Sequence, residues 1–579
     1  MKKISFLFLT LVLLLNSCKN SHSGDADFQK LSEEYISGYL AWRPQNAVSL
    51  GFHEYDGKLD NFSKTSIDAE LARLKKYDEK LAQIDTASLS QKVYYDFSVL
   101  RSAIKNDIFY IEDIKAYTKN PMTYARAIDL NIYIKRNFAP LEERIRSIIE
   151  IEKKIPAFFT DAKSNLEDSL ADPYTKLAIE IARGTASFLG NDMMVAVKES
   201  KDTALLNVLE EVNQKAIGAY QDFAVWLEKE KLPKTHNHYA IGVENYKKML
   251  LYGEAIRMTP DEILEIGLKE LKKEQESFNS AAKIINPNKK PVEVYADLQK
   301  EHSTAENLIP DARKNLEAIR QFLIDKKIIT VPSEVRVKVE ETPPYARETS
   351  TASMDSPGPF EKKATDAYYY ITPVNDKWTE KQKEEWLESF NFYTTDVVSI
   401  HEAYPGHYTQ FLHLNASDAS KIQKIFGSYA FIEGWAHYTE KLIIDEGYGD
   451  NGDKIKAAKY RMAQAGDALL RICRLCVSIK THCHGMTIDE GTKFFMENWY
   501  QGDKPSRQEA LRGTFDPGYL FYTVGKLQIL KLREDYKKQE GANYSLQKFN
   551  DFMLDNGMPQ IQILREMLLK DKKQWDAIL

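Results

Sequence analysis

The 579-residue sequence is poor in net charge, cysteine and histidine. Its formal charge is only -6, with acidic and basic residues nearly balanced. This argues against a nucleic-acid-binding protein, which would carry a basic stripe, and no partner is implied by charge alone. The sequence has no convincing internal repeat and no low-complexity tract. Its composition, 43% hydrophobic and 28% charged, predicts one large lobed domain or two or three smaller ones with a sizeable core.

Only four cysteines are present. Cys473, Cys476 and Cys483 lie close together, and a histidine flanks the last on each side, so a second metal site is one interpretation. The other is a buried core, because Cys473 and Cys476 lie three residues apart in a largely apolar run, where free cysteine behaves as a small apolar residue. We favour the core, and a disulfide between neighbours on one helix is disfavoured.

The apolar run Ile4 to Leu15 at the start of the chain is too short for a typical membrane-spanning helix. Because Lys2 and Lys3 precede it, it is typical of an export signal. Leu15 stands at the third place before Cys18, an arrangement that resembles the bacterial lipoprotein lipobox and implies that Cys18 becomes the acylated first residue. An ordinary secretory signal with an incidental cysteine is the alternative.

These features predict a signal peptide over residues 1–17 and a short polar tether over residues 18–28. The domain that follows would belong to the bacterial cell envelope, with its lipid anchor in a membrane and its body facing the periplasm or the exterior.

Residues 29–330 carry apolar side chains every three or four positions, as in Leu71 to Ile84. This spacing predicts a helical N-terminal region built from long helices and short polar turns. Residues 259–262 (TPDE) and 487–490 (TIDE) combine a threonine cap with a glutamate three residues later, which predicts that a helix begins at each.

The pattern changes between about Ile328 and Pro373. Residues 335–339 alternate as a strand, residues 368–371 resemble a second one, and residues 348–359 between them form a loop rich in Thr, Ser, Gly and Pro. We expect a small sheet at the rim of a mainly helical body, within a second region of residues 331–579. Its edge strand either holds an extended substrate by strand addition or only stabilises the fold.

The sequence HEAYPGH at residues 401–407 carries candidate metal ligands. In the zinc-protease pattern H-E-x-x-H the two histidines share one helix face, but His401 and His407 are six residues apart. Six residues of a straight helix turn by roughly 240° net, so a continuous helix cannot bring both imidazoles to one metal. Pro405 lacks an N–H and Gly406 permits unusual backbone angles. We therefore expect a break that swings His407 back toward His401.

A second segment, EGWAHYTE, follows at residues 433–440. Glu433 and His437 share a helix face, so this segment can offer one or two ligands. A His, Glu, His, Glu set in a chain with only 11 histidines is consistent with zinc and its base, whereas an ordinary helix end without metal is the alternative. His437 is either another metal ligand or a residue that donates a hydrogen bond to one of the ligands. Glu440 either orients a histidine, His407 or His437, or is a solvated carboxylate.

The two segments together resemble the H-E-A-x-P-G-H and E-G-W-A-x-Y-x-E motifs of the domain of unknown function 885 family, bacterial proteins that look like distant relatives of the helical zinc metallopeptidases. The resemblance implies three metal ligands and a general base, namely His401, His407, Glu433 and Glu402. It favours His407 over His437 as a ligand, because the family position that His437 occupies is variable.

Weaker resemblance extends from about residue 30 to the end of the chain. It implies that Tyr522 and His482 are candidates to donate to the oxyanion. We also expect Arg474 to bind substrate, as a two-pronged partner of a carboxylate, together with Tyr519. Alternatively, Arg474 pairs with an acidic residue that has only a structural role. The alternative for Tyr522 and His482 is that they are buried polar residues whose hydrogen bonds are made within the fold. Ser478 stands where many relatives carry Asp and Tyr519 where many carry Gln, which leaves the roles of His482 and Tyr522 open.

We therefore expect a mainly helical, two-lobed zinc metallopeptidase with residues 331–579 as its catalytic region. Glu402 would take a proton from the attacking water and pass it to the leaving amine of a peptide bond. The alternatives are a surface lipoprotein that binds peptides without cleaving them and a metal-dependent hydrolase of a non-peptide amide. Peptide length, end preference, the identity of the metal and the oligomeric state do not follow from the sequence.

Overall fold

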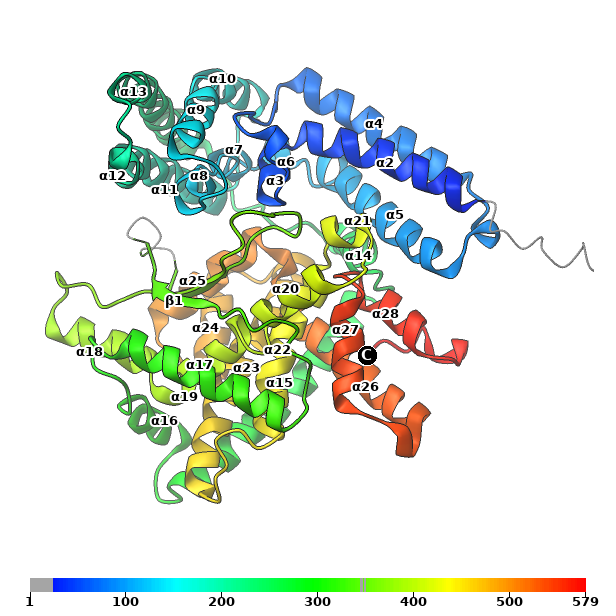
Figure 1. Cartoon of the computed structure of the whole chain (residues 1–579). Helices are drawn as coiled ribbons and strands as arrows, with labels where there is room; N and C mark the ends of the chain where they lie inside the picture. The colour runs from blue at the N-terminus through cyan, green and yellow to red at the C-terminus, as the bar shows by residue number, and fades with distance from the viewer. Residues whose placement is uncertain (1–23, 344–346, 348–349) are drawn as a thin grey trace, which may run out of the picture.

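The structure is a computed structural model that describes residues 24–343, 347 and 350–579. The signal peptide and Cys18 lie outside the described residues. The fold is mainly α-helical with one small sheet, as expected, and its helices form two lobes (Figure 1). None of the helices in the described part of the chain has the length and apolar character needed to cross a membrane.

The N-terminal lobe, blue to teal in Figure 1, packs around two hydrophobic cores. One core joins α2, α4 and α5, and the other joins α9, α10, α11 and α13. The helices of this lobe are α2 (Asp25–Trp42), α3 (Pro44–Ser49), α4 (Lys64–Ala82), α5 (Gln91–Glu112), α6 (Ala116–Lys119), α7 (Met122–Ala125), α8 (Asn131–Lys135), α9 (Leu141–Glu152), α10 (Ile155–Asn165), α11 (Asp172–Phe188), α12 (Met194–Ala196) and α13 (Thr203–Trp226).

The second lobe has the largest core, which runs from Tyr246 to Ile578 and also takes in Phe109. Its helices are α14 (Val243–Glu254), α15 (Pro260–Ile285), α16 (Pro291–Gln299), α17 (Leu308–Asp325), α18 (Glu380–Ser389), α19 (Phe392–Glu402), α20 (His407–Ala416), α21 (Lys421–Ile425), α22 (Tyr429–Asp445), α23 (Lys454–His484), α24 (Ile488–Trp499), α25 (Asp503–Phe515), α26 (Phe521–Glu540), α27 (Leu546–Asp555) and α28 (Ile561–Leu568). The sequence boundary near residue 330 falls inside this core, because α14 to α17 contribute to it and α15 packs along α23.

The predicted helix starts at residues 259–262 and 487–490 are confirmed. Thr259 caps α15 and Thr487 caps α24, each in a complete capping box with the glutamate three residues on. Cys473 and Cys476 are buried and unpaired on α23. Neither group of His, Cys, Asp and Glu in the described residues that is close enough to hold a metal contains a cysteine, in agreement with the core interpretation.

The small sheet has three strands, one more than the sequence predicted. Their order is β1 (Lys338–Glu341), β3 (Tyr368–Ile371) and β2 (Ala352–Asp355). β3 is central and pairs in parallel with β1 and antiparallel with β2. β2 lies in the stretch that the sequence predicted to be a loop. Its composition does not indicate a strand, and it forms one because β3 supplies its hydrogen-bonding partners. It packs next to α19.

Two glycines set the distance between α22 and α26. A Cβ on Gly525 would lie 1.8 Å from the carbonyl oxygen of Ala430, and a Cβ on Gly434 would lie 2.5 Å from the backbone of Gly525. Only glycine at both positions permits this contact of backbone with backbone. Because Gly434 follows Glu433 on α22, the same contact also holds the candidate metal ligand in place.

We predict that Gly525→Ala lowers the free energy of unfolding by at least about 1–3 kcal/mol, the usual cost of overpacking, because the clashing atom belongs to a helix backbone. The measurement is urea unfolding followed by circular dichroism. Gly218→Ala in α13 is the matched control. Nothing lies within 4 Å of its added Cβ, so alanine there should stabilise the helix by about 0.5–1 kcal/mol. Equal midpoints for the two variants would contradict this role of Gly525.

Candidate metal centre

The break predicted between His401 and His407 is confirmed. α19 ends at Glu402 and α20 begins at His407. Across the turn, the Gly406 N–H donates to the carbonyl of Ile400 at 3.0 Å. A Cβ on Gly406 would lie 1.7 Å from the carbonyl oxygen of His401, so glycine is needed here for space. Its φ of -70° is open to any residue.

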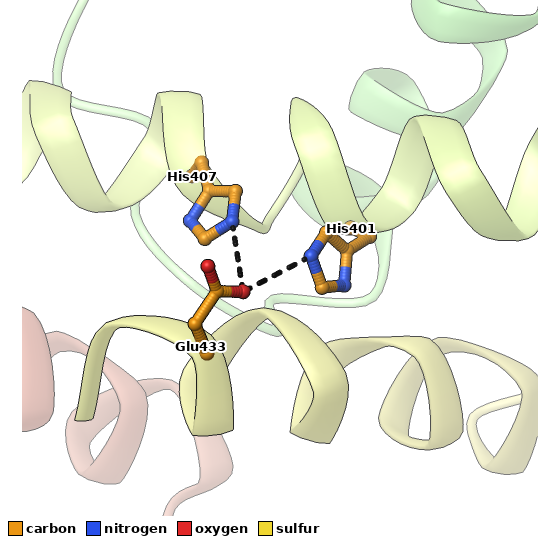
Figure 2. Close-up of side chains that lie close together, drawn as sticks. All are labelled: His401, His407 and Glu433. Carbon is orange, nitrogen blue, oxygen red and sulfur yellow. Dashed lines mark ion pairs between the residues drawn. The ribbon is translucent and has the colours of Figure 1, made fainter. Parts of the chain in front are cut away.

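α22 anchors this turn and adds the third ligand. The Trp435 indole N–H donates to the Pro405 carbonyl at 2.9 Å, which holds the turn against α22. Glu433, two residues earlier, directs its carboxylate to both imidazoles (Figure 2). Its Oε2 lies 3.5 Å from Nε2 of His401 and 3.5 Å from Nε2 of His407.

The geometry of this trio fits a zinc ion. Ligand atoms about 2.0–2.1 Å from a tetrahedral zinc are roughly 3.3–3.4 Å apart, close to both observed separations. The imidazole rings lie 4.9 Å apart at 90° to each other. Oε2 of Glu433 is buried and makes no hydrogen bond with the described residues, an arrangement that a bound cation would satisfy. His401 is buried, whereas His407 and Glu433 are partly exposed.

The charges of the trio are coupled to one another. Burial by itself would lower the pKa of His401, but the Glu433 and Glu440 carboxylates raise it to about 10. Burial would raise the pKa of Glu433, but the two imidazoles hold it well below its usual range. A metal ion that binds Nε2 of His401 at neutral pH must therefore displace a proton.

Glu440 settles one question that the sequence left open. It is fully buried and accepts hydrogen bonds from two histidines, His401 through Nδ1 at 2.7 Å and His437 through Nδ1 at 2.9 Å. Its partners are thus His401 and His437, and His407 is not among them. Because Nδ1 of His401 is held by Glu440, Nε2 is turned to Glu433, the arrangement that orients histidine ligands in metal sites.

His437 does not join the trio of candidate ligands. Its Nε2 lies 3.4 Å from the ammonium group of Lys526. His437, Glu440 and Asp467 form a second group close enough to hold a cation. Arg471, however, pairs with Asp467 and lies 3.4 Å from Glu440. Since Lys526 and Arg471 already supply positive charge, this group is better explained as a buried ionic support for His401.

The predicted base, Glu402, follows His401 in the last turn of α19 and is partly exposed. Its carboxylate makes no hydrogen bond or ion pair with the part of the chain that the structure describes. Burial, and in part the negative charge of Glu402, raises the pKa of Tyr369 on β3, so Glu402 lies within electrostatic reach of the sheet. An acceptor without competing bonds is what a general base requires.

Tyr522, in the first turn of α26, lies beside the site. Its ring packs 5.8 Å from that of Tyr429, which is one helical turn before Glu433 on α22. Burial raises the pKa of the Tyr522 phenol, the Glu433 carboxylate raises it further, and nearby arginines oppose this. Of the two predicted oxyanion donors, Tyr522 is therefore the one that lies within the electrostatic reach of a candidate ligand.

Two other predicted site residues, His482 and Arg474, are engaged elsewhere, and a third, Tyr519, is enclosed by the fold. His482 is 1% exposed, donates from Nε2 to the carbonyl of Gly513 at 2.8 Å and accepts at Nδ1 from the backbone of Ile241 at 3.3 Å. Burial lowers its pKa to about 4. Arg474 makes two bonds of 2.7 Å with Glu509. Tyr519 is fully buried. These contacts agree with the structural alternatives for His482 and Arg474.

Sequence reasoning missed Arg512 and the cavity near it. A cavity of about 490 Å³ is lined by residues of both lobes, among them Tyr110, Tyr174, Tyr429 and Asp516. Arg512 on α25 pairs with Asp516 at 2.9 Å and lies 6.0 Å from the Tyr522 ring centre. The only sequence signal for Arg512 was its place five residues before the Pro-Gly of the closing segment.

Two solved structures are similar over almost the whole chain. One is a candidate lipoprotein of unknown function from Shewanella oneidensis, with 24% identity, a TM-score of 0.78, and coverage of 94% of this chain and 100% of that one. The other, a candidate lipoprotein from Colwellia psychrerythraea, has 17% identity, a TM-score of 0.79, and coverage of 95% and 99%. At these identities the similarity shows a shared fold.

No curated protein matches the sequence. A family model described as a bacterial protein of unknown function (DUF885) matches residues 44–568. This match takes in the helices of both lobes and all three candidate ligands, His401, His407 and Glu433. The chain therefore belongs to the DUF885 family of bacterial proteins.

Proposed function

We propose that this protein is a zinc-dependent peptidase. The observation that carries the proposal is the convergence of two imidazole nitrogens on one buried, otherwise unbonded carboxylate oxygen of Glu433. Two histidines and a glutamate are a ligand set found in catalytic zinc sites, which keep a fourth position for water or substrate. The partial exposure of His407 and Glu433 supports access to that position.

The residues around the trio have separate tasks in this proposal. When bound, zinc would supply a Lewis acid that polarises the scissile carbonyl and lowers the pKa of a water molecule. Glu402 takes the proton of the attacking water and delivers it to the departing amine. Tyr522 donates a hydrogen bond to the oxygen that becomes negative, and its raised pKa keeps the phenol protonated at neutral pH. Glu440 keeps Nε2 of His401 turned toward the metal.

The sheet supports a peptide as the substrate. β2 lies at an edge of the sheet as described and packs next to α19, the helix that ends at Glu402. An extended peptide can add to such an edge as a further strand, so that its backbone is held by main-chain hydrogen bonds. This arrangement would place a peptide bond next to the proposed metal ligands. A small non-peptide amide has no extended backbone that could pair with the edge strand.

A lipid anchor is part of the proposed function. The lipobox at Cys18 and the two structural relatives described as candidate lipoproteins support acylation of Cys18 and a place in the bacterial cell envelope. The hydrolase would then act on peptides outside the cytoplasm.

We predict that the purified protein binds about one zinc ion per chain and that Glu433→Ala abolishes this binding. Glu440→Gln should weaken zinc binding by about 10- to 100-fold, because an amide cannot accept from both imidazoles at once. The measurement is metal analysis together with competition against a chelator. Glu244→Ala, at an exposed glutamate, is the control and should bind zinc as the wild type does. A folded wild-type protein that takes up no added zinc would refute the proposed site.

We predict that Glu402→Ala lowers the rate of peptide hydrolysis by about 10²- to 10⁴-fold, the usual contribution of general acid–base catalysis. Zinc content and peptide affinity should persist, because Glu402 is not a proposed ligand. Turnover is measured with a library of peptides and resolved by mass spectrometry. Unchanged turnover in the variant would rule out this mechanism, and binding without turnover in the wild type would favour a peptide-binding lipoprotein.

We predict that the full-length chain, expressed in a bacterium, is recovered with membranes and that Cys18→Ser moves it to the soluble or secreted fraction, because the acyl chains are lost. Fractionation and mass spectrometry of the N-terminus give the result. A membrane-bound Cys18→Ser variant would contradict anchoring through this residue.

A further inference from the structure

Three arginines surround the ring of Tyr522, next to the candidate metal centre. The guanidinium carbons of Arg474, Arg471 and Arg512 lie 5.2, 5.7 and 6.0 Å from the ring centre. All three belong to the α23–α25 side of the site, whereas the metal ligands come from α19, α20 and α22. The Tyr522 ring therefore lies next to a group of arginines beside the proposed zinc ligands.

Two of these arginines are already used by the fold. Arg474 forms a two-bond pair with Glu509, and Arg471 pairs with Asp467 and lies near Glu440. Their side chains are only 9% and 10% exposed. A ligand that took either guanidinium would leave a largely buried carboxylate, Glu509 at 16% exposure or Asp467 at 17%, without its partner, which is unfavourable.

Arg512 differs in both exposure and bonding. Its side chain is 33% exposed. Its Nε and Nη2 donate to a single oxygen, Oδ2 of Asp516, at 3.1 and 2.9 Å, and the guanidinium also bonds the Tyr522 hydroxyl. Asp516 and Tyr522 thus fix the side chain. Because a guanidinium has five N–H donors, the exposed part of Arg512 keeps N–H groups for a ligand.

The charge of Arg512 is only partly balanced by Asp516. The Asp516 carboxylate also attracts Arg126, so two guanidiniums share one carboxylate. Asp516 and Tyr429 line the cavity of about 490 Å³, a volume within the range of ligand pockets. Tyr429 leads along α22 to Glu433, one helical turn away. Asp516 therefore links Arg512 to the cavity, and Tyr429 links the cavity to the candidate metal centre.

We propose that Arg512 binds a free carboxylate of the peptide substrate while the peptide occupies the site between the cavity and the metal centre. The planar guanidinium fork matches a carboxylate. A phosphate dianion is disfavoured, because the carboxylates of Asp516, Glu509 and Glu433 lie near these arginines or the tyrosine. The carboxylate is either the C-terminus, which would make the enzyme a carboxypeptidase-type exopeptidase, or an acidic side chain. This inference rests on the proposed peptidase function and names its substrate class.

The test uses zinc-treated Glu402→Gln protein, in which bound peptides stay intact, and three peptides of equal length. One has a free C-terminus, one is its amide, and one is an amide with glutamate as its last residue. Affinity is measured by calorimetry. We expect the peptide with the recognised carboxylate to bind about 10- to 100-fold more tightly than the plain amide. Tight binding of the free acid identifies the C-terminus, and tight binding of the glutamate amide identifies the side chain.

Additional substitutions in the same protein assign the effect to Arg512. Arg512→Gln should remove the preference for the carboxylate, and Arg512→Lys, which keeps the charge but not the fork, should retain part of it. Arg507→Gln on the same helix, where Arg507 pairs with Asp489 at the surface, should bind all three peptides as before.

Equal affinity of the parent for all three peptides, no binding of any of them, or an equal loss for all three in Arg512→Gln would overturn the proposal. Zinc content is measured in the same samples, so failure of the metal site is seen separately from failure of carboxylate recognition.

Discussion

The candidate site depends on one carboxylate oxygen that is buried without a hydrogen bond. Oε2 of Glu433 has only two imidazole nitrogens near it, each at 3.5 Å. An isolated charge in such surroundings is strongly unfavourable, so both histidines must stay in place for the helices to pack as they do. The raised pKa of His401 favours its protonated form, which supplies the opposite charge. A bound zinc ion would supply it more fully, and stability would then be coupled to metal binding.

Two backbone features place these side chains, and both rely on glycine. Gly406 allows the chain to turn back on the carbonyl of His401, so that histidines six residues apart face one point. Gly434 and Gly525 let α22 and α26 touch through their backbones, which brings Glu433 and Tyr522 to the same wall. The short E-G-W motif thus combines a ligand, a packing contact and, in Trp435, the anchor of the Pro405 turn.

Behind the ligands, a buried ionic network determines how His401 is oriented. Glu440 accepts from His401 and His437, and Lys526 and Arg471 supply positive charge on either side. The same arginine belongs to the group of arginines around Tyr522. Support for the candidate metal centre and the proposed recognition of substrate would therefore draw on one continuous set of charges, in which Arg512 is more exposed than Arg471 and Arg474.

The sequence by itself determined the helical class and the helix starts at Thr259 and Thr487, because each depends on spacing within a few residues. It singled out His401, His407, Glu433 and Glu402 as candidates through their resemblance to the family motifs. The third strand, the partners of Glu440 and the packing of α14 to α17 with the C-terminal core were decided only by the tertiary structure. The same holds for Arg474 and Arg512. They share a residue type and a neighbouring tyrosine, yet Arg474 meets Glu509, 35 residues away in the chain, and Arg512 remains partly exposed. Residue type and local spacing specify what a side chain can bind, whereas its available partners depend on which helices pack against it.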